Sequence, residues 1–271
     1  MLARRHALVA LAAGLLTAGL PVAIPSQARA EAPRLKVVAT TGMIADAARQ
    51  VGGSLVEVTA LMGPGVDPHA YRQTRSDIAA MARADLVVWH GLYLEAQMEE
   101  FLRDLSRRRK VVAVAEQIPR SALRAHTEYK DKFDPHVWMS PELWAMVVGA
   151  VRDALVAAHP AGKATFEANA VKHQSDVAQL HAYARKALGS VPAERRVLIT
   201  AHDAFNYFGT AFSFEVLGIQ GISTESEAGL NRIRELVDLI VARRISAIFV
   251  ESSVSDRNVK ALIEGAAARG H

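Results

Sequence analysis

Short apolar runs alternate with stretches of helical periodicity along the first part of the chain. The runs are rich in β-branched residues and predict strands over 35–41, 56–62, 85–91 and 110–115. Apolar residues three or four positions apart predict helices between them, over 43–51, 78–84 and 94–105. Strands that alternate with helices in this way are typical of a parallel sheet with helices on its faces.

A single long helix is predicted after this first block. From 163 to 188 the chain has neither Gly nor Pro, and its apolar residues recur mostly three or four positions apart, at Phe166, Ala170, Val177, Leu180, Ala184 and Leu188. Gly189 marks the end of the helix, with Lys186 in the last turn. At 1.5 Å per residue, about 25 residues would span roughly 40 Å, which is enough to brace two lobes.

A second alternating block follows the long helix. Strands are predicted over 196–200 and 247–251, with helices from 204, over 233–243 and over 259–268, and an apolar segment over 216–219. The last helix should cover a further strand, so this lobe is expected to be incomplete at His271. The chain is therefore predicted to be an α/β protein with two Rossmann-like lobes, each with a parallel sheet, joined by one long rigid helix. The predicted parts are a signal peptide (1–30), an N-terminal lobe (31–158), the linking helix (159–189) and a C-terminal lobe (190–271).

The first thirty residues have the layout of a secretory signal peptide. Arg4 and Arg5 precede an apolar run over 7–24, and a small-x-small cleavage site follows at Ala28-Arg29-Ala30. The alternative is a membrane anchor, but two prolines interrupt a run that is already short for crossing a bilayer. Export with cleavage is therefore expected, and the arginine pair leaves both the general and the twin-arginine routes open.

The composition of the chain limits which cellular compartments and which partners are expected. The leader holds three of the 32 basic residues and none of the 28 acidic ones, so 29 basic face 28 acidic residues in the rest of the chain. Without a concentrated basic face we expect no nucleic-acid partner. The chain has no Cys, so neither disulfides nor a lipidated cysteine are expected. These features favour an unlipidated, freely diffusing monomer in the periplasm of a bacterium with two membranes.

Three of the ten histidines lie where predicted strands pass into loops. His69 follows VEVTALMGPGVDP, His136 lies in FDPHVWMSP and His202 follows VLITA. Ligand sites of open parallel sheets gather at the carboxyl ends of strands. Two of the three histidines follow Asp-Pro, which biases Asp67 and Asp134 toward extended backbone, and these carboxylates could accept the second ring N–H. Imidazoles suit Zn²⁺ and also bind Mn²⁺, so a shared metal site is a hypothesis that only the fold can test.

Four stretches carry a specific resemblance: VVATTGMIADAARQVGG, GVDPHAYRQTRSDIAAMARADLVVWHGLYLE, DPHVWMSP and ITAHDAFNYFG. They resemble the metal-binding solute-binding proteins of ATP-driven Mn²⁺ and Zn²⁺ importers, the TroA/ZnuA-like family. The resemblance implies two α/β lobes joined by a rigid helix, with one transported metal ion between them. It also implies that His69 and His136 are ligands from the first lobe and His202 is a ligand from the second. The partner would be an ABC-type permease in the inner membrane.

The resemblance also implies a fourth ligand, an Asp in a glycine-rich stretch, which would lie beyond His271. We therefore expect either a truncated chain or a metal with three protein ligands and water. Glu251 closes the predicted strand over 247–251 and is expected to orient a histidine rather than to act as a weak ligand. His90 stands where the family often has Asn, and packing in a loop is expected for it rather than ligation. His271 is not expected to reach the site.

The sequence leaves open both the identity of the metal ion and the type of function. The region over 120–133 has only His126 and no histidine run, which weakens a dedicated zinc-scavenging role, so Mn²⁺, Zn²⁺ and Fe²⁺ stay open. One alternative is a zinc-dependent hydrolase that uses the three-histidine site, with Glu251 or Asp203 as general base. A second alternative is a binding protein for a metal chelate. The resemblance implies a non-catalytic carrier, and the chain shows no HExxH motif and no nucleophile elbow that would favour the hydrolase.

Overall fold

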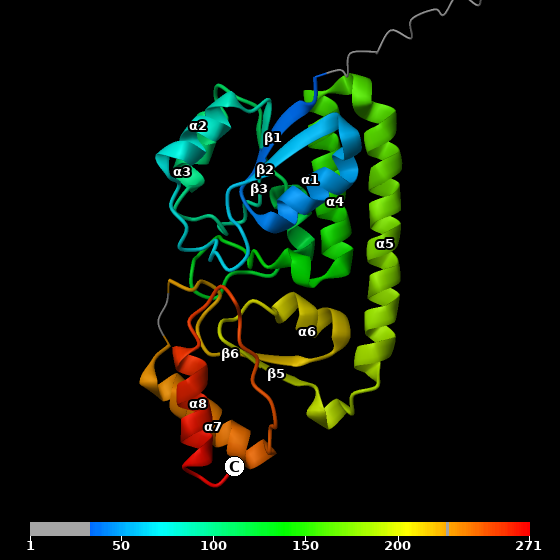
Figure 1. Cartoon of the computed structure of the whole chain (residues 1–271). Helices are drawn as coiled ribbons and strands as arrows, with labels where there is room; N and C mark the ends of the chain where they lie inside the picture. The colour runs from blue at the N-terminus through cyan, green and yellow to red at the C-terminus, as the bar shows by residue number, and fades with distance from the viewer. Residues whose placement is uncertain (1–32, 226–227) are drawn as a thin grey trace, which may run out of the picture. The chain divides into compact units, whose positions relative to one another are not determined.

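Four short strands form a parallel sheet in the order β2-β1-β3-β4 in the computed structural model, which describes residues 33–225 and 228–271 (Figure 1). The strands are β1 (Leu35–Ala39), β2 (Val56–Ala60), β3 (Leu86–Trp89) and β4 (Val111–Ala113). β1 pairs with β2 from Leu35 opposite Val56 onward. From β1 the chain first adds β2 on one side of the sheet and then returns to add β3 on the other side of β1. The carboxyl ends of β1 and β3 therefore flank a topological switch point. The predicted signal peptide lies outside the described residues.

Both faces of this sheet are buried, as is usual for parallel sheets. Because side chains alternate along a strand, Val37 and Val88 lie in one core and Val38 and Val87 in another. The first core contains residues of α1 (Gly42–Gly52), α4 (Pro141–Ala158) and α5 (Lys163–Gly189). The second contains residues of α2 (Arg75–Arg83) and α3 (Glu99–Leu105).

The helix predicted over 94–105 is wrong in its first turns. Observed α3 begins at Glu99, and before it the backbone N–H groups of Leu94 and Met98 bond to carbonyls three residues back, as in successive tight turns. Gly91 and the two residues after it adopt left-handed backbone, and the chain then passes through these turns before the regular helix starts at Glu99. Helix α4 has no counterpart among the predicted elements, although Ser140 caps it and Pro141 opens it.

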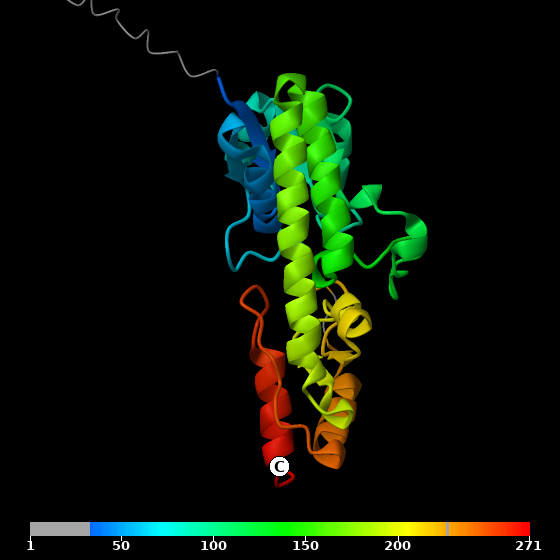
Figure 2. The same cartoon turned by 90° about the vertical axis from the view of Figure 1, so that its right-hand side faces the viewer.

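Helix α5 confirms the predicted long helix. It has 27 residues. It packs on α1 and α4, and its second half lies beside α6 (Asn206–Phe212), as both views show (Figures 1 and 2). Its apolar stripe is only partly buried: Phe166, Ala170 and Val177 lie in the interior, whereas Leu180 is 59% exposed. The packing on α1 and α4 therefore buries the N-terminal half of the apolar stripe more completely than the C-terminal half.

A second, smaller sheet pairs β5 (Val197–Thr200) with β6 (Glu215–Gly218) in parallel. Its core joins Ile199 to α7 (Leu230–Arg243) and α8 (Arg257–Ala267). The strand predicted over 247–251 is wrong: the segment makes a single bridge, in which Phe249 N–H donates to the carbonyl of Ile199. Its β-branched composition favours a strand, but one ladder bond does not make one.

Short 3-10 turns complete the described elements: Gly53–Leu55, Ala115–Gln117, Arg120–Ala122, Val137–Met139, Pro160–Gly162 and Ala193–Arg195. The α/β class, with parallel sheets and one long helix, agrees with the prediction. Residues 33–271 cluster as one compact unit, and the division into 31–158, 159–189 and 190–271 stays a prediction. Among the described helices, none combines the length and the apolar character needed to cross a membrane.

Candidate metal centre

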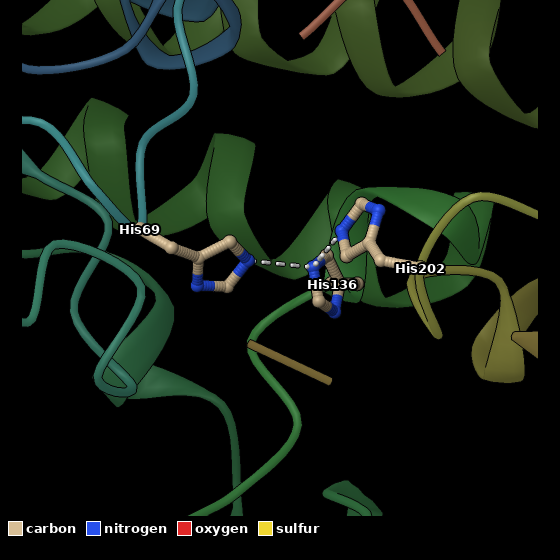
Figure 3. Close-up of side chains that lie close together, drawn as sticks. All are labelled: His69, His136 and His202. Carbon is tan, nitrogen blue, oxygen red and sulfur yellow. Dashed lines mark hydrogen bonds between the residues drawn. The ribbon is translucent and has the colours of Figure 1, made fainter. Parts of the chain in front are cut away.

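Three histidines from separate loops meet at one point (Figure 3). His69 lies in the loop after β2, His136 directly precedes the 3-10 turn Val137–Met139, and His202 follows β5 by two residues. The Nε2 atom of His136 lies 3.2 Å from that of His69 and 3.3 Å from that of His202. All three side chains are buried, so their nitrogens face one another away from solvent.

The Asp-Pro-His turns hold two of these histidines through their backbones. Asp67 Oδ1 accepts the backbone N–H of His69 at 2.9 Å, and Asp134 Oδ1 accepts that of His136 at 3.0 Å. Such side-chain-to-backbone bonds across two residues stabilise a turn locally. The same short motif therefore presents both imidazoles in a defined direction.

The two aspartates then differ in what else they bind. Asp134 Oδ1 also lies 2.7 Å from the ring Nδ1 of His136, which is the contact expected for both residues. Asp67 instead accepts the hydroxyl of Thr224 at 2.5 Å through Oδ2. Asp134 therefore orients a ring, whereas Asp67 ties its loop to a segment far along the chain.

A carboxylate lies beside the Nδ1 atom of both His136 and His202. Glu251 Oε1 accepts the backbone N–H of His202 at 3.0 Å, and its Oε2 lies 2.6 Å from the ring Nδ1. When Nδ1 carries the proton toward a carboxylate, Nε2 is left with a bare lone pair. The two facing Nε2 atoms at 3.3 Å then both offer lone pairs, an arrangement that a cation between them would stabilise.

Burial keeps the imidazoles of His69 and His136 neutral, which is the form that binds metal. Burial first, and then the charges of His136 and His202, lower the pKa of His69 to about 2. Burial likewise holds the pKa of His136 well below its usual value. Burial would raise the pKa of Glu251, but the hydrogen bonds and charge of His202 outweigh it and lower the pKa, so this carboxylate is ionised at neutral pH.

A cavity of about 420 Å³ adjoins the three histidines. Its walls come from the segments 41–43, 62–69, 138–139 and 251–253 and include the carboxylate of Glu251. The cavity lies between loops of the larger sheet and loops of the smaller one. This gives an ion a route to the buried nitrogens.

The other candidate residues do not belong to the group of facing histidine nitrogens. His90 is fully buried, and its Nε2 donates to the carbonyl of Pro135 at 2.6 Å. His271 is exposed and bonds to the carbonyl of Ile245 at 2.7 Å. Asp203 bonds through its backbone N–H to the carbonyl of Gly221, and burial raises the pKa of its carboxyl.

Two residues of α6 that sequence reasoning left without a role support the His136 turn. Tyr207 donates its hydroxyl to the backbone carbonyl of Asp134 at 3.0 Å, and Asn206 lies 3.4 Å from the Asp134 carboxylate. Both follow His202 closely in HDAFNYFG, so their proximity in the chain was the one available signal. Helix α6 therefore connects the loop of His202 to that of His136.

Known proteins resemble this chain over most of its length. Residues 37–270 match the family described as ZnuA, "Zinc-uptake complex component A periplasmic". The manganese-binding lipoprotein MntA of Bacillus subtilis is 45% identical over 88% of this chain and 78% of its own length. The zinc-binding protein TroA of Treponema pallidum is 44% identical over the whole chain and 87% of its own length. The solved structure of TroA superposes with a TM-score of 0.84, at 44% identity over 88% of this chain and 86% of that one.

Proposed function

Since this chain belongs to the ZnuA family of periplasmic zinc-uptake components, we propose that it captures one divalent metal ion through His69, His136 and His202. Its relatives are metal-binding substrate-binding proteins of ABC transporters, which favours a carrier over the hydrolase and the chelate-binding protein. In this proposal the protein releases the ion to a membrane permease and catalyses no reaction. The ion is therefore cargo rather than a cofactor.

One observation carries the proposal: three buried Nε2 atoms converge, and carboxylates hold the opposite nitrogen of two of these rings. Zinc binds imidazole at about 2.0–2.1 Å with tetrahedral geometry, which places neighbouring ligand nitrogens about 3.3 Å apart. The two closest Nε2 separations, 3.2 and 3.3 Å, match this spacing. The nitrogens thus suit an ion of this size.

The cargo is proposed to be Mn²⁺ or Zn²⁺. MntA is named for manganese and TroA for zinc, and both are similar to this chain to the same degree. Nitrogen ligands accommodate several divalent first-row metals, and affinity generally rises along the series toward copper. Glu251 is proposed to orient His202 and to stabilise the bound cation with its charge, because its two oxygens already face the backbone and ring of that residue.

The compartment is proposed to be the periplasm. The matched family is described as periplasmic, and the first thirty residues have the layout of a cleaved leader. MntA is named a lipoprotein, whereas this sequence has no Cys to carry a lipid, so we propose an unlipidated monomer that docks on its permease by diffusion.

Elemental analysis of protein purified without added metal tests the proposal, followed by competition titration with Zn²⁺ and Mn²⁺. We expect one ion per chain and a loss of at least about a hundredfold in affinity for His136→Ala. His181→Ala, a matched change on α5 away from the site, should bind as the wild type does. Unchanged tight binding by His136→Ala would refute the assignment. Metal-dependent ester hydrolysis that requires Glu251 would revive the hydrolase.

A further inference from the structure

Glu95 is a fully buried carboxylate in the turns between β3 and α3. It accepts the hydroxyl of Thr40 at 2.6 Å and the backbone N–H groups of His90 at 2.8 Å and Gly91 at 3.1 Å. Burying a charged group is unfavourable unless hydrogen bonds satisfy it, so these three donors are what keeps the carboxylate in the interior. Glu95 thereby links the carboxyl end of β1 to that of β3.

The turn that Glu95 holds has an uncommon backbone. Gly91, Leu92 and Tyr93 have φ values of 84°, 54° and 70°, all in the left-handed region. Residues with side chains disfavour this region, and such conformations persist where the surrounding contacts impose them. The two backbone bonds to Glu95 are such contacts, and they determine where the chain leaves β3 and thus where His90 points.

His90 passes this constraint to the metal centre. Its Nε2 donates to the carbonyl of Pro135, which directly precedes His136, at 2.6 Å. Its ring also lies edge-on to Trp138, with centroids 5.3 Å apart, and Trp138 lies in the same way against His136 at 5.1 Å. Because Nε2 is used in this bond, His90 supports the His136 turn and does not contribute this nitrogen to the ion.

We propose that Glu95 and His90 are positioning residues that hold the His136 turn in the geometry needed for tight metal binding. The inference rests on the proposed function and extends it to residues that do not touch the ion. Removing residues that orient a ligand typically costs ten- to a hundredfold in metal affinity. We call the contacts that lead from Glu95 through His90 to Pro135 the relay. The relay is separate from the contacts of Asp134 and α6, which hold the same turn through other atoms.

A matched set of histidine variants tests the first step. His90→Leu removes the bond to Pro135 and should weaken Zn²⁺ and Mn²⁺ binding about tenfold or more. His90→Gln can place an N–H donor where Nε2 lies and should stay within about threefold of wild type. His181→Leu is the control, because among the described residues His181, like His90, has a buried ring nitrogen without a partner. It should leave the affinity unchanged.

Two further readouts separate positioning from loss of fold. Urea unfolding of the metal-free variants gives their stability, and the visible absorption of bound Co²⁺ reports the coordination geometry. We expect His90→Leu to alter the Co²⁺ spectrum while the protein remains folded, and His90→Gln to restore it. An unchanged affinity and spectrum in His90→Leu, or equal losses in the Leu and Gln variants, would overturn the proposal.

A double-mutant cycle tests whether Glu95 acts through His90. Glu95→Gln keeps the size of the side chain but places an amide donor where an acceptor is needed, so it should also weaken binding severalfold. In the His90→Leu background it should cost little more, because the relay is already broken. If the loss of affinity in the double variant equalled the product of the two single losses, the two residues would act independently, and the relay would be overturned. If wild-type protein bound no metal at all, the proposed function itself would fail, which is a different result.

Discussion

The imidazole of His136 is constrained at both ring nitrogens. Asp134 lies 2.7 Å from Nδ1, while Nε2 faces the other two histidines. A proton on Nδ1 leaves a lone pair on Nε2, so the carboxylate determines which nitrogen is free to bind an ion. Glu251 has the corresponding contact with His202. Two carboxylates thus lie beside the Nδ1 atoms of two proposed ligands, on the side of each ring away from the facing Nε2 atoms.

Replacing Glu251 by Gln should weaken zinc binding by ten- to a hundredfold. The amide can donate to Nδ1 of His202, which favours the tautomer with its proton on Nε2, facing the ion. Competition titration with a chromophoric chelator measures the change. Glu264→Gln, an exposed position on α8, is the control and should bind as wild type does. Equal affinities for both variants would contradict the orienting role of Glu251.

The metal-free protein should lose stability as pH falls. Burial lowers the pKa of His69 to about 2 and that of His90 to about 3, so the folded state binds fewer protons than the unfolded chain below pH of about 6.5. When the pH falls from about 7.5 to about 5.5, each of these two histidines should lower the unfolding free energy by about 1.4 kcal/mol. Burial raises the pKa of Asp134 to about 6, and this group partly offsets the loss because its folded form takes up a proton first.

Urea unfolding in the presence of a chelator at the two pH values measures this dependence. In His90→Gln the loss should be smaller by about 1.4 kcal/mol, because one titrating group is gone. A free energy of unfolding that stays constant between the two pH values would show that these histidines are not held neutral.

At the scale of single elements, side-chain caps start the helices that surround the site. Thr41 accepts the N–H of Ile44 at the start of α1, and Ser140 accepts that of Leu143 at the start of α4. Both caps lie at the site end of their helices, next to loops that line the cavity. Helix α2 has a full capping box, in which Thr74 and Asp77 bond reciprocally.

Thr74→Ala should lower the unfolding free energy by about 1 kcal/mol, because an N–H group of α2 loses its acceptor. The metal affinity should not change, since α2 packs into the core around Met81 and contributes no residue to the cavity wall or to the three histidines. Thr165→Ala, an exposed position on α5, is the control and should alter stability by less than about 0.5 kcal/mol. Equal effects of both substitutions on urea unfolding would argue against the cap.

Within the whole molecule, the proposed ligands come from three loops that lie far apart in the chain. His69 and His136 belong to loops of the larger sheet and His202 to a loop of the smaller one, and α6 connects the last two. Since the unfolded chain cannot hold the three nitrogens together, an ion that binds them stabilises the folded state. Binding and folding are therefore coupled.

Free Zn²⁺ at about a hundred times the dissociation constant should raise the unfolding free energy by about 2.7 kcal/mol. Thermal and urea unfolding with and without a chelator measure the gain. His136→Ala should gain much less at the same concentration. A gain of the same size in wild type and variant would mean that the ion stabilises the protein from another site.

The local pattern of the sequence predicted much of the fold. Apolar runs marked the positions of β1, β2, β3 and β5, and periodicity marked α5, because burial of a strand or a helix face leaves its period in the chain. The segment over 247–251 shows the limit of this approach. Its composition suits a strand, but a strand exists only where a neighbour completes the ladder, and here one bond forms.

The sequence by itself determined which histidines were candidates, because each of the local motifs Asp-Pro-His and HDAF places a proposed ligand in a loop. Only the tertiary structure decided that His69, His136 and His202 meet with Nε2 atoms 3.2 and 3.3 Å apart, and that Glu95 reaches the same centre through His90. The physical reason is that such contacts join groups with no fixed relation along the chain. Packing of the sheets and helices sets their distance, and no local period records it.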